Sequence, residues 1–229
     1  GIATAMVGVA EDFAEDRGKD GTWLHIREEL PENLRFWSRL KYVPVRQDGP
    51  SIEMAKTLWL AREVPDPEAM HRLASKVASL LKPGDVLVLT GDLGAGKTTF
   101  TQGLGAALGV RGPITSPTFV LSREHPRLGA GPALVHVDAY RLGGAAELDD
   151  IDRDSTLDSS ITVVEWGEGM AEQLTDSWLL VNIEVRSVRE SDPQGAACGE
   201  ESEEMRVVSI RPRGPRWIEV PLRSTLLST

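Results

Sequence analysis

The segment 91–98, Gly-Asp-Leu-Gly-Ala-Gly-Lys-Thr, holds the residues with the clearest potential for chemistry. It matches the pattern G-x-x-x-x-G-K-[ST], in which glycines let successive backbone N–H groups point at a chain of phosphates. Lys97 would bring a positive charge to the outer phosphates, and the hydroxyl of Thr98 is a ligand for Mg²⁺. A helix that begins here would turn its positive N-terminal end toward the same anion. The segment therefore predicts a loop that binds a nucleoside triphosphate together with magnesium.

The neighbours of this segment have the order that such a loop requires. Residues 86–89, Val-Leu-Val-Leu, form a short apolar run typical of a parallel strand buried on both faces. After the loop, Gly109 suits the end of a helix whose apolar residues recur at helical spacing. These residues are Phe100, Leu104, Ala107 and Leu108. The sequence therefore predicts a strand, a phosphate loop and a helix of an α/β protein.

Two carboxylates follow apolar strands elsewhere in the chain. Residues 134–138, Leu-Val-His-Val-Asp, end in Asp138, and the run 161–166, Ile-Thr-Val-Val-Glu-Trp, places Glu165 similarly. Because the carboxyl ends of parallel strands meet at one edge of a sheet, both acids would lie at the edge that holds the phosphates. One would bind Mg²⁺ or its waters and the other would polarise water; the residues alone do not divide these roles, and a strand-end cap is the alternative for each. His136 is expected to be a buried structural histidine with a hydrogen bond.

Two further side chains are candidates for contact with phosphate. Thr118, in the conformationally restricted segment 115–120, is a candidate sensor of the terminal phosphate, and a plain turn residue is the alternative. Arg141 lies three residues beyond Asp138 and could reach a transferring phosphate, or form a surface ion pair instead.

Composition limits the classes of function. The chain has 229 residues, enough for one domain of good size or two small ones, and its net charge is −10. Without a dense block of lysine and arginine, unassisted binding to nucleic-acid backbone is disfavoured. A single cysteine permits no internal disulfide and no cysteine-rich zinc site. Because the sequence shows neither a membrane-length apolar run nor a signal peptide, we expect a cytoplasmic protein without a membrane segment.

The first part of the chain, residues 1–58, differs in character from the remainder, and we expect a small α+β fragment there ahead of a second domain at 59–229. Residues 23–26 are expected to form a strand, and the segment 29–42, Glu-Leu-Pro-Glu-Asn-Leu-Arg-Phe-Trp-Ser-Arg-Leu-Lys-Tyr, a short helix followed by extended chain. This segment resembles the last motif of GNAT acyltransferases, where an asparagine precedes a helix and a tyrosine closes it. Because that family's acyl-CoA loop, R/Q-x-x-G-x-G/A, does not precede it, the resemblance implies a fused remnant and not an acetyltransferase.

The second domain contains several further predicted elements. Asp66 suits the N-cap of a helix that buries one apolar stripe, and alternation over 178–185 predicts a half-exposed edge strand. The stripe consists of Met70, Leu73, Ala74, Val77 and Leu81. The acidic segment 189–204 is expected to be a disordered loop, with an acidic arm for a partner as the alternative. Residues 205–210 and 217–220 are expected to form a terminal hairpin.

Four of these motifs together resemble the TsaE (YjeE) family, the small ATPases of bacterial tRNA threonylcarbamoyladenosine synthesis. They are 91–100, then 116–119 (Ser-Pro-Thr-Phe), 136–142 (His-Val-Asp-Ala-Tyr-Arg-Leu) and 164–166 (Val-Glu-Trp), in the family's order. The resemblance implies a P-loop NTPase-like three-layer sandwich with a mainly parallel sheet. One departure is Gly167, where the family usually has proline.

The resemblance also implies the site and its use. Catalytic roles fall to Asp138, Glu165 and Thr118, and Mg²⁺ would be ligated by Thr98 and Glu165. The implied nucleotide-binding residues are Asp92, Leu93, Gly94, Ala95, Gly96, Lys97, Thr98, Thr99 and Trp166. The implied cofactors are ATP and Mg²⁺, and the implied partners are TsaB and TsaD, with tRNA met only through their complex. The modified base is the adenosine next to the anticodon of tRNAs that read codons starting with A.

Two other functions share the phosphate loop. A small-molecule kinase would need an arginine-rich lid and an acceptor pocket, for which the stretch with Arg123, His125 and Arg127 is a thin candidate. A scaffold locked by nucleotide would bind ATP with negligible turnover. A GTPase is disfavoured because the base-reading motif Asn-Lys-x-Asp is missing, and an ABC-type ATPase because its glycine-rich signature is missing. Phosphate release with ATP, GTP and candidate acceptors would separate these classes.

Overall fold

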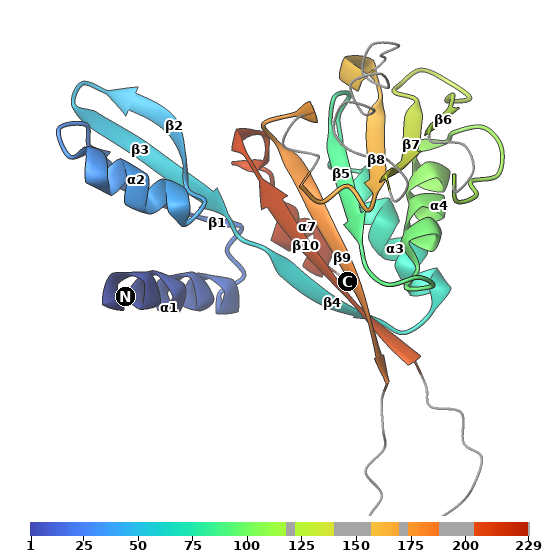
Figure 1. Ribbon diagram of the computed structural model, residues 1–229, viewed down its shortest axis with the longest axis horizontal. Coiled ribbons are helices and arrows are strands. Elements are labelled where there is room, and N and C mark those ends of the chain that lie inside the picture. Colours follow the sequence, from blue (N-terminus) through green and yellow to red (C-terminus); the bar gives the residue numbers. More distant parts are fainter. Residues whose placement is uncertain (118–121, 140–156, 170–173, 188–203, 229) are drawn as a thin grey trace, which may run out of the picture.

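The computed structural model describes residues 1–117, 122–139, 157–169, 174–187 and 204–228, and these form two sheets (Figure 1). A three-stranded sheet has the order β1-β3-β2, and a seven-stranded sheet has the order β4-β10-β9-β5-β8-β7-β6. Thr118, Arg141 and the acidic segment up to residue 203 lie outside the described residues, so the predictions made for them stay predictions.

The N-terminal sheet is antiparallel and packs against a helix. Its elements are β1 (Gly21–Arg27), α2 (Pro31–Arg39), β2 (Val43–Asp48) and β3 (Ser51–Thr57). Trp37 of α2 meets Tyr42 edge to face, with 5.0 Å between ring centroids, and both pack with the buried Met54 of β3. The predicted strand and helix of this region are confirmed, whereas the division of the chain into domains at residue 58 stays a prediction.

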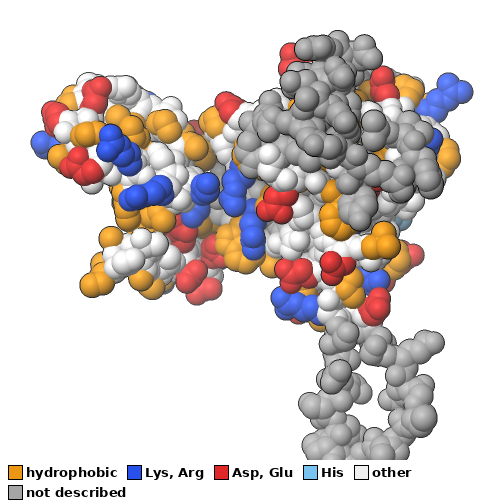
Figure 2. Space-filling model, in the orientation of Figure 1, with side chains coloured by type: hydrophobic (Ala, Val, Ile, Leu, Met, Phe, Trp, Pro, Cys, Tyr) orange, Lys and Arg blue, Asp and Glu red, His pale blue; other side chains and the backbone are white. Residues whose placement is uncertain are grey.

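The structure adds a helix that the sequence did not predict, α1 (Ile2–Asp16). None of its residues is buried, and the apolar side chains at its surface include Ile2, Met6, Val9 and Phe13 (Figure 2). Val7 alone packs against the core of the small sheet. Ile2, Met6, Val9 and Phe13 do recur at helical spacing, which is the signal that could have found this helix, but the stripe faces outward and not into a core.

The larger sheet has a parallel centre and antiparallel margins. Its strands are β4 (Leu60–Val64), β5 (Val86–Thr90), β6 (Ser122–His125), β7 (Leu134–Asp138), β8 (Ile161–Glu165), β9 (Trp178–Ser187) and β10 (Glu204–Arg213). Strands β9, β5, β8 and β7 are mutually parallel, while β6, β10 and β4 pair in antiparallel fashion. The α/β class is confirmed, and the strand, loop and helix around residues 91–98 have the order of a P-loop NTPase-like fold.

Helices α3 (Pro67–Ala78), α4 (Lys97–Leu108) and α7 (Leu222–Leu227) share the main hydrophobic core with one face of the sheet. The carboxylate of Asp66 accepts the N–H of Ala69 at 2.6 Å, which confirms the predicted N-cap. Gly109 ends α4 at φ 68°, as expected, although Ala107 is exposed and not part of the apolar stripe. A smaller apolar cluster, with Val86, Val137 and Val164, covers the opposite face of the sheet.

Two predictions about the C-terminal strands were wrong. Strand β9 is not an edge strand, because β10 pairs with one side of it and β5 with the other. Its alternation comes from its two faces: Val181 and Ile183 are buried in the core, whereas Glu184 is exposed. No terminal hairpin forms between 205–210 and 217–220, since Trp217 lies fully buried in a 3-10 turn (Pro215–Trp217). Alternation reports which face is covered and not how many neighbours a strand has.

Several hydrogen bonds join the N-terminal elements to the C-terminal segment that packs on the larger sheet. Arg223 of α7 donates to the carbonyl oxygens of Trp59 and Glu15, and its guanidinium lies 3.7 Å from the Glu15 carboxylate. The Thr57 hydroxyl donates to the carbonyl of Trp217 at 2.6 Å.

Among the helices that the structure describes, none is both long and apolar enough to traverse a bilayer.

Candidate nucleotide-binding site

The phosphate loop leaves β5 and runs directly into α4, and its glycines have backbone angles that other residues avoid. Gly91 has φ 138° and Gly96 has φ 114°, both in the region that favours glycine. At Gly91 a Cβ atom would lie 2.3 Å from the carbonyl oxygen of Ile183, so space forbids a side chain as well. The backbone angles at Gly91 and Gly96 and the lack of space at Gly91 therefore explain why glycine stands at these positions of a loop shaped to curl around an anion.

Lys97 is buried at the first turn of α4, where its ammonium group is held by the loop itself. Its Nζ donates to the carbonyl oxygens of Gly91 at 2.7 Å and Asp92 at 2.9 Å. It also lies 4.1 Å from the ring centroid of Trp166, a cation–π contact. The loop thus holds the ammonium group at its centre, where phosphates would replace the carbonyl oxygens as partners.

Burial lowers the pKa of Lys97, and nearby carboxylates oppose that shift. The largest cause is desolvation, because a charge loses its hydration inside the protein. Glu165, Asp138 and Asp92 each raise the pKa by their negative charge. The lysine and these three acids therefore share one electrostatic environment.

Asp138 and Glu165 lie side by side at the carboxyl ends of adjacent parallel strands. They are register partners between β7 and β8, and Leu89 at the end of β5 pairs with Glu165 from the other side. Both carboxylates are nearly buried, with exposed fractions of 6% and 3%. The hydroxyl of Thr98 donates to Glu165 Oε1 at 3.3 Å. The structure therefore brings together the loop lysine, the loop threonine and the two acids, as the strand pattern predicts.

His136 has a closer connection to the site than its sequence position suggests. It is fully buried, and its Nε2 lies 2.9 Å from Glu165 Oε1. An ionised carboxylate only accepts hydrogen bonds, so the tautomer of His136 with hydrogen on Nε2 is the one that can donate to it. The expected hydrogen bond is confirmed, but its partner is the candidate metal ligand. The signal in the sequence is the spacing of two from Asp138, which puts both side chains on one face of β7.

The remaining predicted loop residues differ in exposure. Asp92, Leu93 and Gly94 form the exposed tip, with 95% of Leu93 accessible, while Ala95 is fully buried. Thr99 is half-buried in the first turn of α4.

Trp166 is half-buried and has φ 61°, an uncommon angle for a residue with a side chain. Its backbone N–H donates to the carbonyl of Leu89 at 3.0 Å, which ties the turn after β8 to the end of β5. This bond fixes the backbone of Trp166 beside the strand that feeds the phosphate loop, and its ring lies over Lys97.

The donors available for a cation suit magnesium bound together with a nucleotide. Within the described residues, no group of three or more His, Cys, Asp or Glu side chains is arranged to hold a metal. Mg²⁺ is usually held by one or two protein oxygen ligands, with waters and substrate phosphates completing its shell. The Thr98 hydroxyl and the Glu165 carboxylate are such a pair of neighbouring oxygen donors.

Comparisons with known proteins place the chain among relatives of known family. The family model described as "Threonylcarbamoyl adenosine biosynthesis protein TsaE" matches residues 64–192. The tRNA threonylcarbamoyladenosine biosynthesis protein TsaE of Streptomyces coelicolor is 50% identical over 149 residues, 65% of this chain and 93% of that protein. The protein of the same name from Bacillus subtilis is 40% identical over 119 residues, 52% of this chain and 73% of that protein.

A solved structure shows the same likeness. The crystal structure of Bacillus subtilis YdiB matches with a TM-score of 0.53 and 30% sequence identity, covering 74% of this chain and 95% of that one. The family model and the solved structure each match more than half of the chain. The chain therefore belongs to the TsaE family of threonylcarbamoyl adenosine biosynthesis proteins.

Proposed function

We propose that this chain is a magnesium-dependent ATP hydrolase that acts in the formation of threonylcarbamoyladenosine in tRNA. The observation that carries the proposal is the convergence of Lys97, Thr98, Asp138 and Glu165 at the loop end of the parallel strands. The pathway is supported by the names of the relatives, which are tRNA threonylcarbamoyladenosine biosynthesis proteins.

Each group at the site has a chemical task that its position favours. The loop amides and Lys97 bind the phosphates, and Thr98 with Glu165 would hold Mg²⁺ against them. When bound, Mg²⁺ neutralises charge on the β- and γ-phosphates. Asp138, beside Glu165 and buried, orients the attacking water. Thr118 contacts the terminal phosphate in this proposal, and Trp166 lies against the nucleotide.

The proposed activity is slow and depends on partners. Within the described residues, the side chain that meets Glu165 at 2.9 Å is a histidine, and no ion pair between Glu165 and an arginine is present. An arginine that stabilises the transition state is worth roughly 10³–10⁵ in rate in related phosphoryl transfer. TsaB and TsaD are the proposed partners that raise the rate, and tRNA is met only through their complex. The expected location is the cytoplasm.

The test measures phosphate release by the purified chain with ATP or GTP, with Mg²⁺ or EDTA, and with or without TsaB and TsaD. Lys97→Ala should lose nucleotide binding, measured by equilibrium titration, because the ammonium group then no longer meets the phosphates. Glu165→Ala should keep binding and lose metal-dependent turnover. Lys82→Ala, which removes a lysine outside the phosphate loop, serves as the matched control and should behave as the unmodified chain.

Three results would contradict the proposal. They are equal activity in the two site variants, a preference for GTP, and phosphate transfer to a small acceptor in place of water. Binding of ATP without turnover, even with both partners present, would identify the chain as a nucleotide-dependent scaffold instead.

A further inference from the structure

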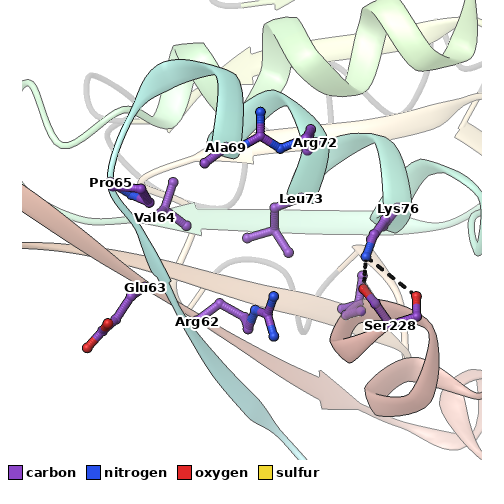
Figure 3. Close-up of a pocket in the computed structure, with 10 residues that line it drawn as sticks. Arg62, Glu63, Val64, Pro65, Ala69, Arg72, Leu73, Lys76 and Ser228 are labelled. Carbon is purple, nitrogen blue, oxygen red and sulfur yellow. Dashed lines mark hydrogen bonds between the residues drawn. The ribbon is translucent and has the colours of Figure 1, made fainter.

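We propose that a groove between β4, α3 and α7 binds an extended, acidic peptide segment of a partner protein. The groove has a volume of about 370 Å³ (Figure 3), and no residue of the phosphate loop lines it. Its cations are Arg62 of β4 with Arg72 and Lys76 of α3, and its apolar lining includes Val64, Leu73 and Leu226. The proposal goes beyond the ATPase function, because no group of the nucleotide site takes part in it.

Three cations line this groove with little to neutralise them. Within the part of the chain that the structure describes, the side chains of Arg62 and Arg72 form no ion pair or hydrogen bond. Lys76 donates to the carbonyl oxygen of Ser228, and because that carbonyl group has no net charge, it does not neutralise the lysine. Glu63 also borders the groove, but its side chain points away from these cations (Figure 3). On a chain of net charge −10, this is a local positive site that selects an anionic occupant.

Helix geometry makes the cations of α3 act together. Arg72 and Lys76 are four residues apart and therefore lie on one face of the helix. Arg62 lies on the same face of β4 as the buried Leu60 and Val64, because side chains two residues apart point the same way. Carboxylates are good partners for guanidinium groups, which bind them through two parallel hydrogen bonds.

The lining beneath the cations is apolar. Val64, Leu73 and Leu226 have exposed fractions of 2%, 6% and 1% and form a firm floor, while the exposed Pro65 and the half-buried Ala69 add accessible apolar surface beside it. A free inorganic anion would use only the cations and leave the accessible apolar surface of Pro65 and Ala69 in water. A peptide with an apolar side chain flanked by carboxylates would use both, since burial of apolar surface adds affinity.

The position of β4 favours an extended occupant. It is the edge strand of the larger sheet, paired only with β10 among the described strands. The outer backbone N–H and C=O groups of such a strand can pair with an added strand, a common mode of peptide recognition. Main-chain pairing would give affinity, and the arginines would give the preference for acidic sequence.

Nucleic acid fits this groove less well than a peptide. Binding of RNA backbone needs a track of several cations along the surface. This groove offers three cations around an apolar floor, and Figure 2 shows acidic and basic side chains interspersed over the described surface in that view. We therefore assign the groove to an acidic peptide.

The test uses the full-length chain and a fluorescein-labelled peptide of sequence Asp-Glu-Leu-Asp-Glu-Val-Asp, followed by fluorescence anisotropy. Saturable binding is expected, and a peptide with lysine in place of each acid should not bind. The double variant Arg62→Ala and Arg72→Ala should weaken binding by about tenfold or more, because each guanidinium then no longer forms a charge-assisted hydrogen bond. The matched control is Arg46→Ala, an exposed arginine of the N-terminal sheet, which should bind as the unmodified chain.

The outcomes separate this proposal from its rivals and from the ATPase proposal. Equal binding by the double variant and the control, or no binding of the acidic peptide at all, would overturn the proposal. Binding of labelled oligouridine in place of the peptide would assign the groove to RNA. Thermal unfolding and ATP binding should be unchanged in the double variant, and Lys97→Ala should still bind the peptide, so failure of either proposal leaves the other testable.

Discussion

Glu165 is held from two sides by residues of this chain. Thr98 donates to its Oε1 at 3.3 Å, and His136 Nε2 lies 2.9 Å from the same oxygen. One carboxylate oxygen is thus fixed by neighbours on α4 and β7. A ligand that is already oriented loses less freedom when it binds a cation, so His136 is a positioning residue for the proposed metal site.

The first prediction concerns His136. His136→Leu should raise the Mg²⁺ concentration needed for half-maximal ATP hydrolysis by roughly 10- to 100-fold, the usual effect of removing such an outer partner. His136→Gln keeps an N–H donor near Nε2 and should recover most of the loss. Magnesium titrations of hydrolysis, with thermal unfolding as the control for folding, provide the measurement. If both variants lose apparent Mg²⁺ affinity equally, the histidine fills space and does not position the acid.

A second prediction at this scale concerns pH. Burial lowers the pKa of His125 on β6, because the imidazolium would lose its hydration there. Below about pH 6.5 the unfolded chain takes up a proton at this residue that the folded chain does not, so stability falls as pH drops. His125→Phe should therefore show a shallower loss of unfolding free energy between neutral and mildly acidic pH.

The measurement is urea unfolding at a series of pH values. One proton changes the slope by at most about 1.4 kcal/mol per pH unit, so the difference between the two proteins should stay below that bound. His25→Gln replaces an exposed histidine and should keep the slope of the unmodified chain. Parallel curves for the unmodified chain and His125→Phe would show that His125 titrates alike when folded and unfolded.

At the scale of elements, the contact between α3 and α4 depends on a glycine. A Cβ at Gly103 would lie 2.7 Å from the Cα of His71 and 3.0 Å from the Cβ of Ala74. Two helices can approach this closely only where one of them has no side chain. Because α4 carries Lys97 and Thr98 at its first turn, this packing also fixes the distance between the phosphate loop and the core.

Gly103→Ala should therefore destabilise the protein by about 1–3 kcal/mol, the usual cost of overpacking a core. Gly8→Ala in α1 is the matched control, since a Cβ there meets nothing within 4 Å. In an exposed helix that change should be neutral or stabilising by up to about 1 kcal/mol. Chemical unfolding curves of both variants test this, and similar stability of the two would mean that the helices can separate at little cost.

For the whole molecule, Arg223 connects segments far apart in the sequence. Its nearly buried guanidinium bonds the carbonyl oxygens of Trp59 and Glu15, so it joins α7, the entry to β4 and the end of α1. Arg223→Met should lower stability by about 1–3 kcal/mol, since both carbonyl groups lose a charged partner. Amide exchange should rise in α1 while β5 stays protected.

Hydrogen exchange followed by mass spectrometry of the full chain would show the effect. Arg46→Met, which changes an exposed arginine on β2, should leave the exchange of α1 as it is. If α1 exchanges equally in the unmodified chain and in Arg223→Met, the contact between Arg223 and Glu15 contributes nothing to holding α1 in place.

The sequence by itself determined the features that depend on neighbouring residues. Glycine spacing and Lys97 revealed the phosphate loop, and apolar runs revealed the central strands and their terminal acids. Local chemistry also identified the N-cap at Asp66 and the helix end at Gly109. Each of these features depends on residues that lie close together in the sequence, so a short window of sequence contains the information needed.

Tertiary structure decided the features that depend on pairing between distant segments. Nothing local indicates that β10 lies between β9 and β4, because the pairing brings Val64 against Arg206 across most of the chain. The bond from His136 to Glu165 likewise needs β7 and β8 in one register. Alternation along a strand reports which face is buried and not which strand lies beside it, and backbone hydrogen bonds are alike at every position. Many strand pairings would therefore be compatible with the local sequence, and only the packing of the whole folded chain determines which strands are neighbours.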